Sequence, residues 1–106
     1  MDANTKRAEE IARDFVNEVK KHISVNKAVL FGSYAKGNYD NGSDLDIAIF
    51  SENFNNKRFV DATAFLFAFA RKYKEICIEP VGFSDMDLKN GSPFIKEIIS
   101  SGKEIQ

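Results

Sequence analysis

Two aspartates with one residue between them are the part of this sequence with the clearest chemical potential. Asp44 and Asp46 open a segment, 44–50, in which the apolar residues Leu45, Ile47 and Ile49 alternate with other residues. This alternation predicts a β-strand, on which both carboxylates point to one face, about 6–7 Å apart at their Cα atoms. Carboxylates this close repel each other unless a cation lies between them, and such oxygen ligands suit Mg²⁺. An exposed strand edge with two solvated aspartates is the ordinary alternative.

A glycine and a serine follow a second predicted strand. The apolar run Ala28–Phe31 stops at Gly32, and Ser33 opens a segment, 33–36, that can form one helical turn. Glycine lets the backbone approach a ligand closely, and a serine hydroxyl beside helix-start N–H groups suits a phosphate. Lys36 would add a positive charge for a triphosphate. An ordinary turn and an exposed loop lysine explain the same residues.

A third acid, Glu79, lies in an apolar segment that predicts a strand over 75–81. Pro80 indicates that this strand ends there or lies at a sheet edge. If the isoleucines of the segment face the core, Glu79 shares its face with Cys77, and a parallel neighbouring strand would set it beside the aspartates. Glu79 could equally be a surface residue at a strand end, and Cys77 is predicted to be a small buried side chain.

The elements that must position these residues follow from the rest of the pattern. Apolar residues at steps of three and four predict a helix over Thr5–Ile23, with Thr5 as N-cap, and length and alanine content favour a helix over Arg58–Tyr73. Pro93 starts a last helix that Gly102 ends. The order is helix, strand, loop, strand, helix, strand, helix, which predicts an α+β (mixed α/β) fold: one small mixed sheet packed against helices.

The phenylalanine-rich helix has an unusually wide apolar arc. On a helical wheel Phe65 and Phe69 fall with Ala62 and Leu66 on the face expected to be core, while Phe67 extends the arc well beyond it. Such an arc on so small a domain indicates either deep burial or an interface with a partner.

Composition limits the function classes. The 106 residues suit one domain over 1–106, and a net charge of −1 excludes a protein that coats duplex nucleic acid. The single cysteine excludes an intrachain disulfide and a Cys-rich zinc site. No segment has the pattern of a signal peptide or a membrane span, so we expect a cytoplasmic protein.

The run GSYAKGNYDNGSDLDIAIF resembles the signature of the polymerase-β-like nucleotidyltransferases, in particular the minimal nucleotidyltransferases of prokaryotes. The resemblance implies their fold, with Gly32 and Ser33 on the β- and γ-phosphates of a nucleoside triphosphate and with Asp44 and Asp46 holding two Mg²⁺ ions. The third family carboxylate, usually Asp, falls on Glu79, which is one methylene longer. Glu79 would ligate a metal or accept the proton of an attacking hydroxyl. The second Asp-x-Asp, 85–87, is expected to cap or solvate a turn.

The resemblance also implies a function and a partner. It implies a nucleotidyltransferase dependent on Mg²⁺ and ATP that moves NMP, usually AMP, to a hydroxyl, such as a tyrosine of a HEPN-domain toxin, and so acts as an antitoxin. Two alternatives stay open: a non-catalytic antitoxin that occludes its partner, and a subunit of a small-molecule adenylyltransferase. Larger relatives hold the acceptor with an additional domain, so a second copy of the chain or a partner protein is expected to complete the pocket.

Overall fold

Four strands form one mixed sheet in the computed structural model, which describes residues 3–37 and 42–106. The strand order is β3-β2-β1-β4; β2 runs parallel to β3, and β1 runs antiparallel to both β2 and β4. The strands are β1 (Lys27–Phe31), β2 (Leu45–Phe50), β3 (Ile78–Phe83) and β4 (Lys103–Glu104). The predicted α+β class with a small mixed sheet is confirmed.

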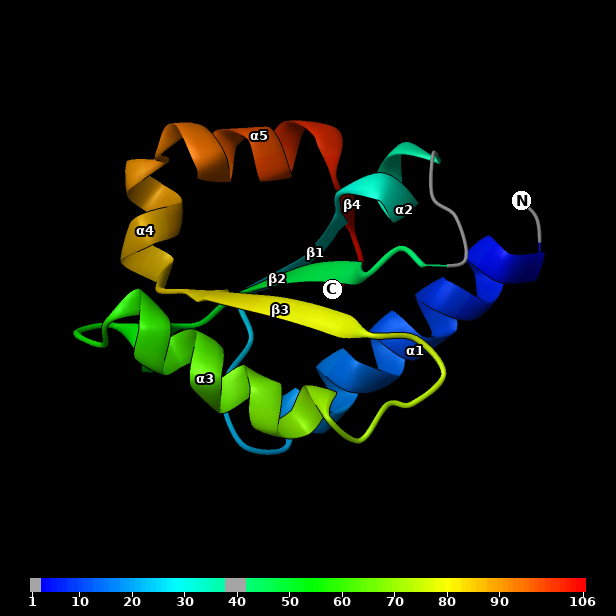
Figure 1. Cartoon of the computed structure of the whole chain (residues 1–106). Helices are drawn as coiled ribbons and strands as arrows, with labels where there is room; N and C mark the ends of the chain where they lie inside the picture. Colours follow the sequence, from blue (N-terminus) through cyan, green and yellow to red (C-terminus); the bar gives the residue numbers. More distant parts are fainter. Residues whose placement is uncertain (1–2, 38–41) are drawn as a thin grey trace.

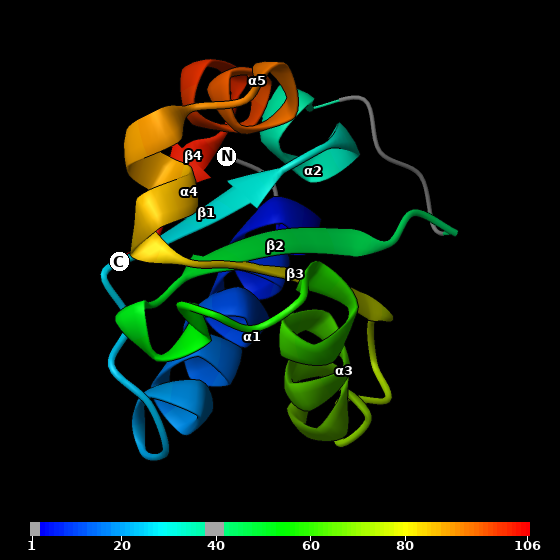
Figure 2. The ribbon, with the colours of Figure 1, turned by 90° about the vertical axis from the view of Figure 1, so that its left-hand side faces the viewer.

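Helices lie on both faces of the sheet. Helices α1 and α3 cover one face, while α2, α4 and α5 lie on the other, so the molecule has three layers (Figure 1, Figure 2). The helices are α1 (Ala3–Lys20), α2 (Ser33–Lys36), α3 (Phe59–Ala70), α4 (Asp85–Asn90) and α5 (Pro93–Ser101), with a short 3₁₀ helix, η1 (Glu52–Phe54). No helix in the described ranges combines the length and the apolar character needed to cross a membrane.

The main core lies between the sheet and the helices α1 and α3. The apolar stripe of α1 brings Phe15 and Val19 onto the sheet, where Ile47 and Leu30 are also buried. The helix begins at Ala3, so Thr5 lies inside it and the predicted N-cap is wrong. The alternation of β2 places its isoleucines in this core and turns Asp46 to the opposite face.

Helix α3 fully buries two alanines and a leucine, whereas its phenylalanines are only partly buried or exposed. Its buried side chains are Ala62, Leu66 and Ala70, whereas Phe65, predicted as core, is 37% exposed. The small side chains let the helix approach β3 so closely that a Cβ on Gly82 would lie 3.0 Å from the Cβ of Ala62. The apolar arc was correctly identified as wide, but its buried centre is displaced from the predicted one.

The C-terminal part adds two elements that the sequence pattern did not predict. Helix α4 follows a capping box in which Ser84 and Asp87 exchange side-chain-to-backbone hydrogen bonds. Asp87 therefore caps a helix rather than a turn. Strand β4 pairs with β1 at the other sheet edge. The last helix begins after Ser92 and ends before Gly102, as predicted, whereas part of the predicted loop, 38–41, lies outside the described residues.

Strand β3 forms one edge of the sheet, as Pro80 indicated. It extends to Phe83 rather than ending near Val81, and it begins only at Ile78. Cys77 thus precedes the strand and is exposed, so its predicted burial is wrong.

Candidate active site

The acids come together because β2 and β3 are parallel and in register. Asp46 pairs with Glu79 across the two strands, so both side chains lie on the sheet face opposite α1 and α3. Asp46 is half-buried and Glu79 is exposed. Asp44 lies immediately before β2 rather than within it, which corrects the predicted start of the strand. The expected neighbourhood of the three acids is therefore present, whereas their catalytic roles stay predictions.

The negative charges of Glu79 and Asp44 act on Asp46. The pKa of Asp46 is raised from 3.8 to about 6, mainly by burial and then by the negative charges of Glu79 and Asp44. A cation that neutralises the neighbouring charges would stabilise the ionised form of such a carboxylate. The electrostatics of the site therefore favour a bound positive charge.

Gly32 lies directly against Asp46. A Cβ added at Gly32 would lie 2.2 Å from Oδ2 of Asp46, and Gly32 has a φ of 76°, which side chains of L residues disfavour. Both the space and the backbone conformation require glycine here. Ser33, half-buried, opens α2 immediately afterwards, so the predicted phosphate-binding pair adjoins the acid pair.

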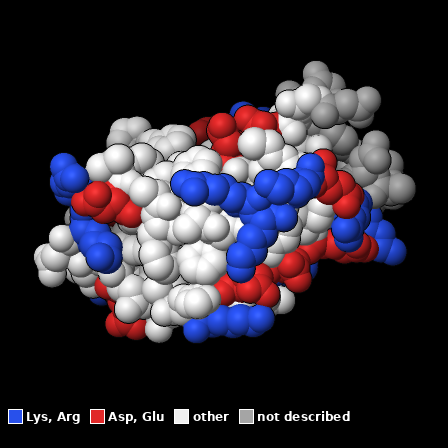
Figure 3. All heavy atoms as spheres, turned by 60° about the horizontal axis from the view of Figure 1, so that its bottom comes forward, with Lys and Arg blue, Asp and Glu red and all other residues white. Residues whose placement is uncertain are grey.

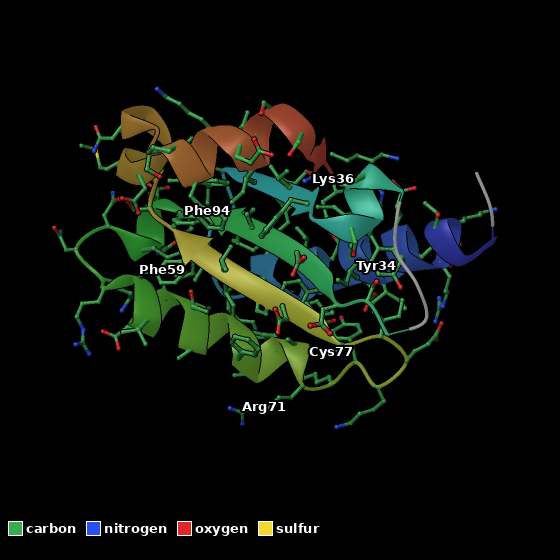
Figure 4. All side chains as sticks on the ribbon, turned by 45° about the horizontal axis from the view of Figure 1, so that its top comes forward. Tyr34, Lys36, Phe59, Arg71, Cys77 and Phe94 are labelled. Carbon is green, nitrogen blue, oxygen red and sulfur yellow. The ribbon has the colours of Figure 1, made fainter. Side chains whose placement is uncertain are left out.

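Lys36 ends the short helix α2, where its backbone N–H donates to the carbonyl of Gly32 at 3.1 Å. Its side chain is exposed, and Figure 4 shows it on the side of the sheet that carries α2, away from Cys77 and Arg71. Lys36 is thus brought near the glycine–serine turn by main-chain geometry, with its ammonium group accessible to solvent.

The donor set fits Mg²⁺, although the side chains do not close around a common point. Asp44, Asp46 and Glu79 supply only oxygen ligands, which this ion prefers, and the raised pKa of Asp46 shows the charge that a cation would neutralise. Within residues 3–37 and 42–106, no three His, Cys, Asp or Glu side chains lie close enough together to hold a metal as they stand. Side-chain rotations would be needed to complete a metal site.

A groove of about 360 Å³ opens beside the acid pair. Its lining combines the two acids with side chains from β1, β3, α3 and α5: Phe31, Asp46, Phe59, Thr63, Phe67, Glu79, Pro80, Val81 and Phe94. Phe59 and Phe94 are each 50% exposed and lie on opposite sides of β3 (Figure 4). Neither phenylalanine is a predicted site residue, because they line one groove only through the packing of α3 and α5 around Phe83.

Cys77 belongs to the surroundings of the site. Its pKa is raised by partial burial, by the charge of Asp44 and by a hydrogen bond to that carboxylate, and to a smaller degree by Glu79. The thiol therefore stays protonated at neutral pH.

Comparison with known proteins agrees with this geometry. The family described as "Polymerase beta, Nucleotidyltransferase" matches residues 14–106. Two proteins of Methanocaldococcus jannaschii, each named "Putative protein adenylyltransferase", are similar to part of the chain. One is 43% identical over 42 residues, covering 34% of this chain and 42% of the relative. The other is 44% identical over 43 residues, covering 39% of this chain and 43% of the relative.

These matches span less than half the length of the two relatives. The fold is also similar to the crystal structure of a "putative nucleotidyltransferase" from Sulfolobus solfataricus, with a TM-score of 0.66. That similarity covers 81% of this chain and 75% of the other at 20% identity, so it concerns the fold alone.

Proposed function

The chain belongs to the polymerase beta nucleotidyltransferase family, and from this we propose that it transfers AMP from ATP to a hydroxyl group of a protein. The observation that carries the proposal is the in-register pairing of Asp46 with Glu79 directly beside Gly32. This arrangement sets acids next to the turn that would hold phosphates. The names of the two archaeal relatives support adenylyl transfer to a protein.

Asp44, Asp46 and Glu79 would hold two Mg²⁺ ions. When bound, such ions stabilise the entering and leaving oxygens of an in-line displacement at phosphorus. The chain contributes the field that attracts them, because Asp46 is half-buried and lies beside two further negative charges.

Gly32 and Ser33 would bind the β- and γ-phosphates. The missing side chain of Gly32 leaves the backbone accessible next to Asp46, and the Ser33 hydroxyl can donate to a phosphate oxygen. Lys36, exposed at the end of α2, would offset part of the triphosphate charge. These residues lie on the β1 side of Asp46, so the leaving pyrophosphate would depart on that side.

Glu79 would serve the acceptor, because β3 lies on the other side of β2 from β1. In the transfer the acceptor oxygen bonds to the α-phosphorus, the bond from that phosphorus to the pyrophosphate oxygen breaks, and the acceptor proton passes to the Glu79 carboxylate. Glutamate is longer than the usual aspartate, and the exposure of Glu79 gives it the freedom to reach an acceptor that enters from the groove.

The acceptor that we propose is a tyrosine of a HEPN-domain toxin, which would make the chain an antitoxin. Aromatic side chains, Phe59 and Phe94, face the groove beside Glu79 and suit a phenol ring. A second copy of the chain or the toxin itself would complete the pocket. Neutralisation by occlusion alone is the rival outcome, and the substitution of Glu for the usual third Asp favours it.

The test is transfer of label from ATP labelled at the α-phosphorus, with Mg²⁺, to the partner protein, which we expect to be a HEPN-type protein encoded by a neighbouring gene. Asp44→Asn and Asp46→Asn should each reduce the rate on the order of 10³-fold or more, because they remove charge that stabilises the transition state. Glu79→Gln should reduce it by about 10²–10⁴-fold. Glu97→Gln, an exposed glutamate on α5, is the matched control and should transfer label at the wild-type rate.

Two results would contradict the proposal. Wild-type rates from Glu79→Gln would show that Glu79 is a surface acid. Absence of transfer to any protein with any nucleotide, together with tight binding of the partner, would favour occlusion.

A further inference from the structure

The groove beside the acids continues along α3. Side chains of α3 at intervals of four residues, Phe59, Thr63 and Phe67, line the first pocket. A second pocket of about 350 Å³ shares Phe67 with it. The second pocket is lined by Phe67, Ala70, Arg71, Tyr73, Lys74, Cys77 and Ile78. We call the two together the α3–β3 groove, because it follows the helix and the edge strand.

The two pockets of the α3–β3 groove carry opposite charge. Asp46 and Glu79 line the first pocket, and Arg71 and Lys74, both exposed, line the second. Lys and Arg side chains gather near the middle of the face formed by α1 and α3 (Figure 3). In the described part of the chain neither Arg71 nor Lys74 forms a salt bridge, whereas Arg7 binds Glu75 at 2.9 Å. Arg71 and Lys74 are thus available for an external carboxylate.

The strand edge itself offers little main-chain bonding. Gly82 donates its N–H to Oγ1 of Thr63 at 3.1 Å, and Pro80 has no N–H to donate. A chain that bound here by extending the sheet would find these positions used or missing. Recognition in the groove therefore depends on side chains, with apolar contacts around Phe67 and ionic contacts at Arg71 and Lys74.

We propose that the α3–β3 groove binds the acceptor protein through an extended acidic segment. The segment's carboxylates would meet Arg71 and Lys74, its apolar side chains would contact Phe67, and its hydroxyl would reach Glu79. The twelve residues of α3 extend about 18 Å, the length of roughly five residues of extended peptide. The proposal rests on the proposed function only in identifying the bound segment as the acceptor.

Charge favours a peptide over a nucleic acid in this groove. Arg71 and Lys74 are two cations, whereas Asp46 and Glu79 line the adjoining pocket and Asp44 lies near Cys77. A strand with a phosphate at every nucleotide would meet these acids along its length, and nucleic-acid affinity depends on many cation–phosphate contacts. An acidic segment with its charge at one end matches the groove better.

The test measures peptide binding to the full chain without nucleotide. The probes are fluorescein-labelled peptides with one tyrosine between leucines and with glutamates on its N-terminal or its C-terminal side. A matched peptide has lysines in place of the glutamates. At low salt, fluorescence anisotropy should show at least one glutamate peptide binding roughly tenfold or more tightly than its lysine counterpart. When the glutamate peptide is added, the chemical-shift changes of backbone amides in ¹H–¹⁵N spectra should concentrate in residues 59–83.

The charge-reversal variant R71E/K74E should abolish or invert this preference. The control K89E/K96E changes the net charge equally at exposed positions on α4 and α5, and it should retain the wild-type preference. Equal binding of the peptides, equal effects of both variants, or shifts centred outside 59–83 would overturn the proposal. Tighter binding of a single-stranded oligothymidylate than of the glutamate peptides would do so as well.

The result separates this proposal from the proposed function. Peptide preference without adenylyl transfer would leave the groove assignment standing and refute the enzyme. Transfer that R71E/K74E leaves unchanged, with no peptide preference, would refute the groove and retain the enzyme.

Discussion

The sheet face opposite α1 and α3 has two halves, one covered by a helix and one open to solvent. In the covered half, β1, β2 and β3 pack against α5 through Val29, Ala48, Phe50, Phe83, Ile95 and Ile98, all buried. In the open half, the same three strands present Phe31, Asp46, Glu79 and Val81, none of them fully buried. Each strand contributes to both halves within a few residues, so the position of one helix separates core from candidate site.

The comparison shows where acids can be accommodated. A carboxylate in the covered half would be surrounded by apolar side chains with no water to solvate it. Asp46 lies two residues before buried Ala48 on the same face of β2, at the boundary between the two halves. Its raised pKa reflects the partial burial at this boundary. Glu79, further toward the strand edge, is exposed. The open half is therefore the part of this face in which ionised carboxylates can be accommodated and can bind a cation.

Gly32→Ala should disturb the open half most. The new Cβ would overlap Asp46 Oδ2 at 2.2 Å and would also impose a side chain on a backbone φ of 76°. We expect a loss of about 2–4 kcal/mol in the free energy of unfolding, from the strained backbone and the displaced carboxylate together. Urea unfolding followed by circular dichroism measures it.

Gly37→Ala is a control that lacks the contact; the ψ of Gly37 is 9°, whereas that of Gly32 is −151°. Gly37 has a φ of 80° as well, but nothing lies within 4 Å of a Cβ placed there. Its cost should be that of the backbone alone, about 1–2 kcal/mol. Equal losses for the two variants would show that contact between Gly32 and Asp46 does not matter.

Much of the fold follows from local pattern. The alternation in β2 predicted correctly which of its residues enter the main core, and the Pro93 and Gly102 signals bounded α5. Helix α4 was missed although Ser84 and Asp87 form a capping box, which is a recognisable signal. Strand β4 has two residues and depends on a distant partner, β1, so no local pattern could indicate it.

The positions of the acids in the site were predictable from the sequence, but the residues that line the groove beside them were not. Asp46 and Glu79 were expected side by side because a parallel pairing aligns them, and the register confirms that placement. Phe65 was expected in the core because large aromatic side chains dominate a helical wheel. The actual contact surface of α3 uses small residues such as Ala62, whose advantage appears only once β3 lies against the helix. The groove around Phe67 depends on the same packing.

The two halves should differ in stability when the same truncation is made in each. Val29→Ala removes a side chain that is 2% exposed beneath α5, so we expect a loss of about 2–3 kcal/mol in the free energy of unfolding. Val81→Ala makes the same change in the open half and should cost about 1 kcal/mol or less. Urea denaturation of both variants, with unchanged m-values, measures the difference. A Val81→Ala loss as large as that of Val29→Ala would mean that the open half is covered.

The smallest expected change in the free energy of unfolding is a gain rather than a loss. The pKa of Asp46 is about 6 in the folded chain against an ordinary value of 3.8, so the folded state binds more protons between these values. The free energy of unfolding therefore falls as the pH rises from about 4 to 6, and the penalty is complete at pH 7. Asp46→Asn cannot ionise and should be more stable than wild type at pH 7. After discounting for solvent screening of this half-exposed group, the gain is about 1 kcal/mol.

Thermal unfolding in EDTA, at neutral pH and near pH 4, measures this effect and should show the advantage of Asp46→Asn disappearing at the lower pH. Asp61→Asn is a control of opposite sign, because Arg58 lowers the pKa of Asp61 and its charge is favourable in the fold. That variant should be no more stable than wild type at pH 7. If Asp46→Asn gave no gain at pH 7, neither burial nor the negative charges of Glu79 and Asp44 would disfavour the ionised form of Asp46. The open half would then lack the field that we expect to attract a cation, even if the same variant abolished adenylyl transfer.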